Sequence, residues 1–179
     1  MTHYGGADLA AAFRTVRKNT ITIAEEIPED QYNFRPAEGT RTVAELLSHI
    51  AHGPRFQQEV NLTGRKNLDG FNYMQFMTDL LADTNKPRTK AQLLELLKTE
   101  GEKFASQLEG LSPEFLNFVM VFPPGGNPPS RSRFDMLMSA KEHEMHHRGQ
   151  LMLIQRMLGL TPHLTREAEA RRAAMLARK

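Results

Sequence analysis

The chain has 179 residues, of which 40% are apolar and 25% charged, with a net charge of +2 and no cysteine. This length predicts a single domain with its own core, and the small net charge argues against a nucleic-acid or membrane partner. The absence of cysteine excludes a thiolate metal site, a disulfide and a cysteine nucleophile, so His, Asp or Glu must hold any metal. The N-terminus lacks a signal-peptide pattern and no apolar run reaches membrane-spanning length, so we expect a cytoplasmic protein.

The first two long helices are predicted from apolar spacing and from start signals. Apolar residues recur alternately four and three positions apart over residues 9–27, and Pro28 follows them. The second helix begins at a capping box formed by Thr42 and Glu45. Gly64 and the polar residues after Leu62 close this second pattern.

The middle of the chain predicts a short helix, a third long helix and an irregular region. Residues 71–83 predict two or three helical turns. Thr89 and Gln92 form another capping box, which opens the third long helix over residues 90–108. Residues 111–131 contain the run FPPGGNPPS and predict a long Pro/Gly loop with a single strand candidate, LNFVMVF.

The C-terminal third predicts the last long helix and an extension. The fourth long helix covers residues 132–158 and ends at Gly159. Residues 163–179 are rich in Ala and Arg, and we interpret them as a basic helical extension that follows a bundle of residues 1–162. Four long helices with polar connections predict an all-α four-helix bundle, with one short extra helix and a Pro/Gly loop before the last long helix.

The segment KEHEMHHRGQL, residues 141–151, carries three histidines. His143 and His147 lie one turn apart on the apolar stripe that faces the core, whereas His146 lies about 100° from His147, toward the edge of the stripe. Burying two neutral imidazoles requires two sets of partners, and one shared divalent ion supplies both. We therefore predict a metal site here, with Zn, Ni, Cu or Fe as the ions that suit imidazole. The stripe comprises Met136, Ala140, His143, His147, Leu151, Ile154 and Leu158.

A third ligand is sought on the second helix, which carries two histidines. His49 flanks its apolar strip and can reach a pocket between helices. His52 points almost opposite the strip, so we expect it at the solvated rim. His3 and His163 fall in terminal or turn regions and carry no signal.

Residues 143–147 also match the His-Glu-x-x-His motif of zinc peptidases. In such an enzyme Glu144 would be the general base and Glu167 the third ligand. Two observations argue against this interpretation. The break GLTP separates the two segments, and one strand candidate gives no sheet edge to align a peptide. We expect Glu144 to pair instead with Arg148, four residues further on.

Two segments resemble the DinB-like superfamily, the four-helix-bundle metalloenzymes of the DNA-damage-inducible and YfiT type. They are NFRPAEGTRTVAELLSHIAH at residues 33–52 and EHEMHHRGQLMLIQRMLGLTP at residues 142–162. The resemblance implies an up-down-down-up bundle, frequently a homodimer, and a zinc or nickel ion. It also implies that His49, His143 and His147 hold this ion.

Three imidazoles leave other coordination positions open to water or substrate. We therefore expect a metal-dependent enzyme acting on a small molecule. The resemblance implies S-transferase, isomerase or hydrolase chemistry, in which a low-molecular-weight thiol can serve as cosubstrate. A stress-responsive metal-binding protein without turnover is the alternative, and a nucleic-acid adaptor with an Arg-rich tail is the weakest hypothesis because of the small net charge. Residues 121–130 are expected as a lid. The side chains expected around the ligands or in the pocket are Phe56, Glu144, His146, Arg148 and Gln150.

Overall fold

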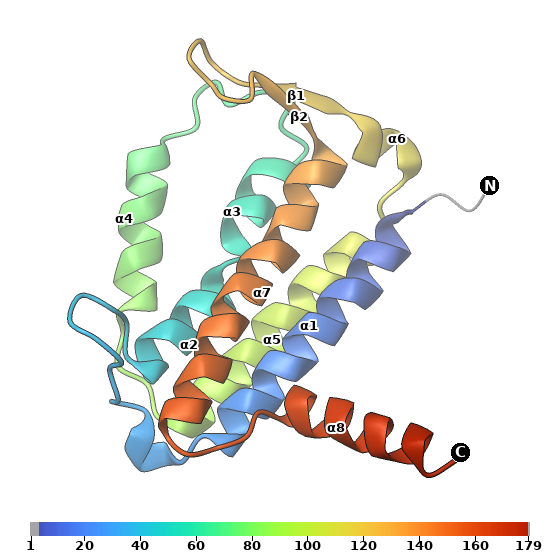
Figure 1. The fold of residues 1–179 in the computed structure, drawn as a ribbon. Coiled ribbons are helices and arrows are strands. Elements are labelled where there is room, and N and C mark those ends of the chain that lie inside the picture. The colour runs from blue at the N-terminus through green and yellow to red at the C-terminus, as the bar shows by residue number, and fades with distance from the viewer. Residues whose placement is uncertain (1–3, 179) are drawn as a thin grey trace.

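Four helices form a bundle in the computed structural model, which describes residues 4–178, so His3 lies outside the described part. These helices are α1 (Gly6–Glu26), α2 (Val43–His52), α5 (Lys90–Glu109) and α7 (Arg133–Met157). Helices α1 and α2 each pack against both α5 and α7. Helices α2 and α5 run in one direction and α1 and α7 in the other (Figure 1), which confirms the all-α, up-down-down-up bundle.

The predicted capping boxes open α2 and α5. Thr42 accepts a hydrogen bond from the Glu45 amide, and the Glu45 carboxylate accepts one from the Thr42 amide. Thr89 and Gln92 make the same reciprocal pair. Each box satisfies two amides that a helix start leaves without partners, so these boundaries follow from local sequence.

The second predicted helix is interrupted rather than continuous. Helix α2 ends at His52, and the chain continues through α3 (Arg55–Gln57) and a π-helical turn, η2 (Gln58–Leu62). Pro54 explains the break, because a proline inside a helix lacks the amide proton and its ring clashes with the carbonyl four residues earlier. The carbonyl of Ile50 is thereby left to accept from the guanidinium of Arg17.

Helix α4 (Tyr73–Thr84) returns the chain to the end of the bundle where α2 begins (Figure 1). It packs against α2, and within α4 only Thr84 is buried. A 3-10 turn, η1 (Glu29–Gln31), links α1 to the loop before α2. The parallel direction of α2 and α5 depends on α4, because α4 carries the chain back along the bundle.

The region expected as a loop with one isolated strand contains more regular structure. After α6 (Pro113–Asn117), strand β1 (Val119–Val121) pairs antiparallel with β2 (Ser130–Ser132). The expectation of an unpaired strand was therefore wrong. The Ser-Arg-Ser sequence of β2 has no apolar alternation, so the pairing partner could not be recognised from its sequence.

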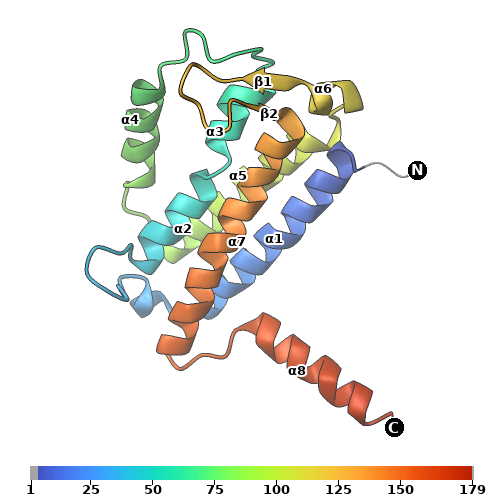
Figure 2. The same ribbon diagram turned by 45° about the horizontal axis from the view of Figure 1, so that its top comes forward.

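Helix α8 (His163–Leu176) projects away from the bundle (Figures 1 and 2). Its first residue, His163, is buried and lies 3.3 Å from the side-chain oxygen of Asn19, so this histidine has a structural contact that its position in the sequence did not indicate. Within residues 4–178, the helices include none that combines the length and apolarity needed to cross a bilayer.

Candidate metal centre

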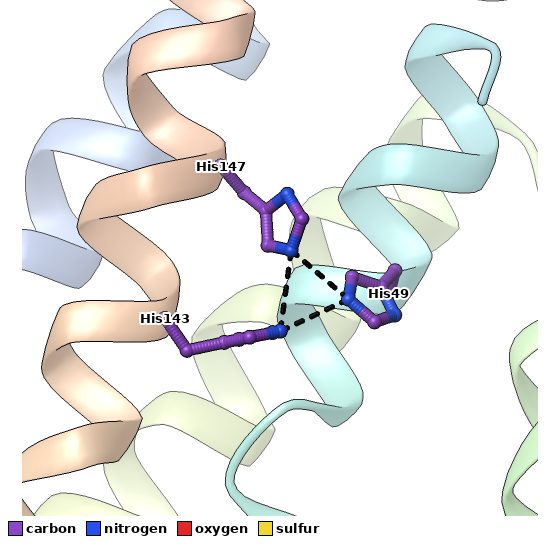
Figure 3. A group of neighbouring side chains, drawn as sticks. All are labelled: His49, His143 and His147. Atoms are coloured by element: carbon purple, nitrogen blue, oxygen red, sulfur yellow. Dashed lines mark hydrogen bonds between the residues drawn. The ribbon is translucent and has the colours of Figure 1, made fainter. Parts of the chain in front are cut away.

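Three histidines from two helices converge between α2 and α7 (Figure 3). The Nε2 atom of His49 lies 3.0 Å from that of His143 and 3.1 Å from that of His147. The Nε2 atoms of His143 and His147 are 3.2 Å apart. Helix α7 places its two histidines one turn apart, and α2 presents the third across the seam. The three residues of the predicted metal site are therefore brought together.

The protein alone cannot satisfy these three nitrogens. Each imidazole Nε2 carries either one proton or one lone pair, so three mutually close nitrogens can form at most one good hydrogen bond among themselves. A single cation accepts all three lone pairs. Three imidazole nitrogens bound at about 2.0–2.1 Å to one tetrahedral ion are about 3.3 Å from one another. The observed separations of 3.0–3.2 Å fit this donor set.

The electrostatic surroundings keep the three imidazoles neutral. Burial lowers the pKa of His49 to about 3, and the positive charge of Arg41 adds to this effect. Burial, followed by repulsion from His147, lowers the pKa of His143 to about 4. Burial also lowers the pKa of His147. Neutral imidazoles are the form that binds metal, so the triad is in its ligating state at neutral pH.

Gln150 fixes the orientation of one ligand. Its side-chain oxygen accepts a hydrogen bond from Nδ1 of His147 at 2.8 Å, and its amide nitrogen lies 3.3 Å from Nε2 of His146. A proton on Nδ1 leaves the lone pair of His147 on Nε2, which faces the other two histidines. His146 is exposed and lies beside the triad, as expected, with its ring edge-on to that of His147 at 4.8 Å between centroids.

Glu144 does not pair with Arg148 as expected. It is buried and receives the Nε proton of Arg17 from α1 at 2.9 Å. Arg17 also donates to the carbonyls of Leu97 and Ile50. The i to i+4 rule describes exposed helix faces, and a buried carboxylate instead takes a cation from the neighbouring helix. Arg148 is half-buried and its Nε has no hydrogen-bond partner among the described residues.

His52 is also misplaced by the sequence interpretation. It is 1% exposed rather than at the rim, and its Nδ1 donates to the carbonyl of Ser48 at 2.7 Å. Its Nε2 lies 3.3 Å from the carboxylate of Asp83 on α4. The helical wheel of α2 could not reveal this burial, because the face that carries His52 is covered by α4, a separate element whose docking depends on tertiary contacts.

A cavity of about 410 Å³ adjoins the triad. His49 and His143 line it together with Phe56, so Phe56 lies in the pocket wall as expected. The lining comes from α2, α3, α4 and α7, and no described residue of 121–130 contributes to it, so the expected lid role of that segment is not borne out by the lining. Phe122 instead packs into the apolar cluster that Phe56 borders. The lining residues are His49, His52, Gly53, Phe56, Gln57, Tyr73, Met77, Leu80, Thr84, Ser139, Ala140 and His143.

Glu167, the third ligand of the peptidase hypothesis, lies on α8. Its side chain is 55% exposed and pairs with Arg171. Helix α8 leaves the bundle at the end of α7 and projects outward (Figure 2). The third imidazole comes from α2, upstream of the His-Glu-x-x-His run, and Glu144 faces α1 rather than the triad.

A family model described as the DinB superfamily matches residues 12–151. The chain belongs to this superfamily. The uncharacterized protein YjoA of Bacillus subtilis (strain 168) is 29% identical over 153 residues, which cover 86% of this chain and 90% of YjoA. The crystal structure of YjoA, a DinB-like protein, matches with a TM-score of 0.64 and 28% identity over 86% of this chain and 93% of that one.

A second solved structure, YfiT from Bacillus subtilis, matches this DinB-superfamily chain with a TM-score of 0.67. The identity is 16%, and the match covers 90% of this chain and 91% of YfiT. YfiT is described as "a probable metal-dependent hydrolase with an unusual four-helix bundle topology". At this identity the comparison shows the shared bundle topology.

Proposed function

We propose that this protein is a metal-dependent enzyme in which His49, His143 and His147 hold one divalent ion, zinc or nickel. The observation that carries the proposal is the convergence of three neutral imidazole nitrogens that cannot satisfy one another. The bound ion would supply Lewis-acid activation of water or of a small-thiol cosubstrate, which supports hydrolase or S-transferase chemistry. The description of YfiT as metal-dependent agrees with this proposal.

The residues around the triad have separate roles in this proposal. Gln150 holds His147 in the tautomer that ligates. Phe56, Tyr73 and Met77 give the adjoining cavity an apolar wall that can bind a small molecule and exclude water from it. The cavity reaches His49 and His143 directly, and this access favours an enzyme over a metal-binding protein without turnover. A structural metal site would be closed by a fourth protein ligand.

The test begins with metal content. The purified protein, incubated with zinc or nickel and then desalted, should retain one ion per chain by mass spectrometry, whereas His49→Ala should not. His146→Ala is the matched control, because it removes an exposed histidine from α7, the helix that carries His143 and His147, and should keep the ion. Loss of metal binding in both variants, or in neither, would contradict the proposed ligand set.

The second stage tests turnover. The metal-loaded protein is assayed against activated esters and amides, and against electrophiles with small thiols, with the His49→Ala variant as the blank. Metal-dependent conversion that the variant lacks supports an enzyme. Stoichiometric metal without conversion in either assay would favour a metal-binding protein without turnover.

A further inference from the structure

A second cavity lies on the other side of the triad along the α2–α7 seam. Its volume is about 790 Å³. On α7, Ala140 and His143 line the first cavity, whereas Gln150 and Ile154 line the second. On α2, Leu46 lines the second cavity and the first begins one turn later at His49. The histidine triad therefore lies between the two cavities. Thr84 lines both, so the two cavities adjoin at this residue of α4.

The two cavities differ in charge. The first is lined by aromatic and aliphatic side chains with neutral polar groups. The second contains two guanidinium groups, from Arg35 and Arg41, and one carboxylate, from Glu45. Arg35 neutralises Glu45 through a contact of 3.1 Å, and the same carboxylate accepts the amide proton of Thr42. The second cavity therefore has an excess positive charge, which comes from Arg41.

Arg41 is exposed and has no ion-pair partner among residues 4–178. Arg41 lines the second cavity together with Gln150, whose side-chain oxygen lies 2.8 Å from Nδ1 of His147, so the cavity that Arg41 lines extends to the residue beside the triad. A guanidinium that lines a cavity and has no protein carboxylate as its partner is suited to bind the carboxylate of a ligand. Its planar shape matches a carboxylate in two parallel hydrogen bonds. Gln150, which also lines this cavity, is already engaged by His147 and His146.

We propose that the second cavity binds the carboxylate of a small-molecule cosubstrate, that Arg41 recognises this carboxylate, and that the reactive end of the cosubstrate lies at the triad. Leu153 and Met157 are 60% and 51% exposed on the same wall, and they can contact the aliphatic part of such a molecule. The apolar cavity on the opposite side then takes the second reactant. This inference rests on the proposed function, because the triad defines where the two reactants meet.

The test uses a spectroscopic readout rather than turnover. The protein is loaded with cobalt(II), whose visible spectrum changes when a thiol joins the ion, and is titrated with 3-mercaptopropionate and with 2-mercaptoethanol. The two probes differ in that only the first carries a carboxylate. We expect the carboxylate thiol to bind about five- to ten-fold more tightly, the size of one charge-assisted hydrogen bond at a partly exposed site.

Arg41→Gln should abolish this preference and leave the affinity for 2-mercaptoethanol unchanged. Arg172→Gln, which removes one exposed positive charge from α8, should preserve it. Because the charge of the ion itself attracts anions, a preference that survives in Arg41→Gln would overturn the inference. Equal affinities of the wild type for the two thiols would also overturn it. A cobalt spectrum that responds to neither thiol would overturn this inference alone, whereas a protein that takes up no cobalt would overturn the proposed function and this inference with it.

Discussion

Helix α7 contributes to two polar clusters, one buried and one partly buried, that differ in how completely the protein satisfies their hydrogen-bonding groups. On one side, Glu144 meets Arg17, and their side chains are 2% and 4% exposed. Each nitrogen of that guanidinium donates to a protein oxygen, either the carboxylate or a backbone carbonyl. On the other side, the triad formed by His49, His143 and His147 has three nitrogens in contact that lack enough protons to pair. A buried polar cluster completed by protein groups stabilises the fold, and an incomplete one indicates a ligand.

The same comparison explains why the His-Glu-x-x-His motif does not indicate a peptidase site in this protein. The two histidines face α2, and the glutamate between them faces α1. A general base must lie beside the metal-bound reactant, but Glu144 is fixed in a salt bridge with a different helix. The motif therefore divides into a structural residue and two residues of the candidate metal site.

The largest expected effect is on the satisfied cluster. Arg17→Met should lower the free energy of unfolding by about 3–5 kcal/mol, because it leaves the Glu144 carboxylate buried without a cation. Denaturation by urea measures this loss. The double variant Arg17→Met with Glu144→Leu should recover most of the stability, and the metal content of the folded protein should stay unchanged in both. A loss below about 1 kcal/mol in the single variant would contradict the difference between the two clusters.

For the histidine triad, we expect the free energy of unfolding to depend on bound metal more than on the removal of one imidazole. Zinc or nickel at one hundred times its dissociation constant should stabilise the wild-type protein by about 2.7 kcal/mol, because the ion binds only the folded state. In His143→Ala this gain should disappear, while the metal-free variant unfolds within about 1 kcal/mol of the wild type. Thermal melting with and without a chelator measures both quantities. A metal-free His143→Ala protein that fails to fold would show that the triad is structural.

A smaller effect on metal affinity is expected from Gln150, which contacts the proposed ligand His147. Gln150→Leu removes the acceptor that orients His147, and it should weaken metal affinity about 10- to 100-fold without changing the stoichiometry at saturation. Competition with a chromophoric chelator gives the affinity. Gln107→Leu, an exposed glutamine on α5, is the matched control. Equal affinities of the two variants would mean that the His147 ring is held by packing alone.

The smallest expected effect is the pH dependence of stability that comes from Asp83 on α4. The hydrogen bond from Lys86, followed by that from Arg55, holds the pKa of Asp83 well below its usual range. A carboxyl with a lowered pKa in the folded state contributes stability above its ordinary pKa of about 4 and loses that contribution as pH falls. Asp83→Asn should therefore be less stable than wild type at pH 7, and the difference should shrink below about pH 4. Urea denaturation at pH 7 and pH 3 measures it, and an unchanged difference would contradict this assignment.

Features coded locally were predictable from the sequence. The capping boxes at Thr42 and Thr89 and the stripe that carries His143 and His147 depend on residues within one or two turns. His49 followed from its place beside an apolar strip and from the family resemblance. Helical geometry alone could not choose the direction in which α2 would face α7.

Features that depend on contacts between distant segments were missed. Arg17 is 127 positions from Glu144 in the chain, and no local pattern connects them. The burial of His52 depends on α4, and strand β2 on its partner β1. The second cavity likewise brings the loop before α2 against the last turns of α7. Each of these requires the assembled bundle, because the helices must be placed before their outer faces acquire partners.

The central claim is that the third metal ligand is His49, upstream of the His-Glu-x-x-His run. X-ray absorption at the metal edge of the zinc- or nickel-loaded protein tests it directly. We predict three imidazole nitrogens at about 2.0–2.1 Å in the wild type and in Glu167→Ala. His49→Ala should not retain the ion. An unchanged spectrum in His49→Ala, or a ligand lost in Glu167→Ala, would contradict the account.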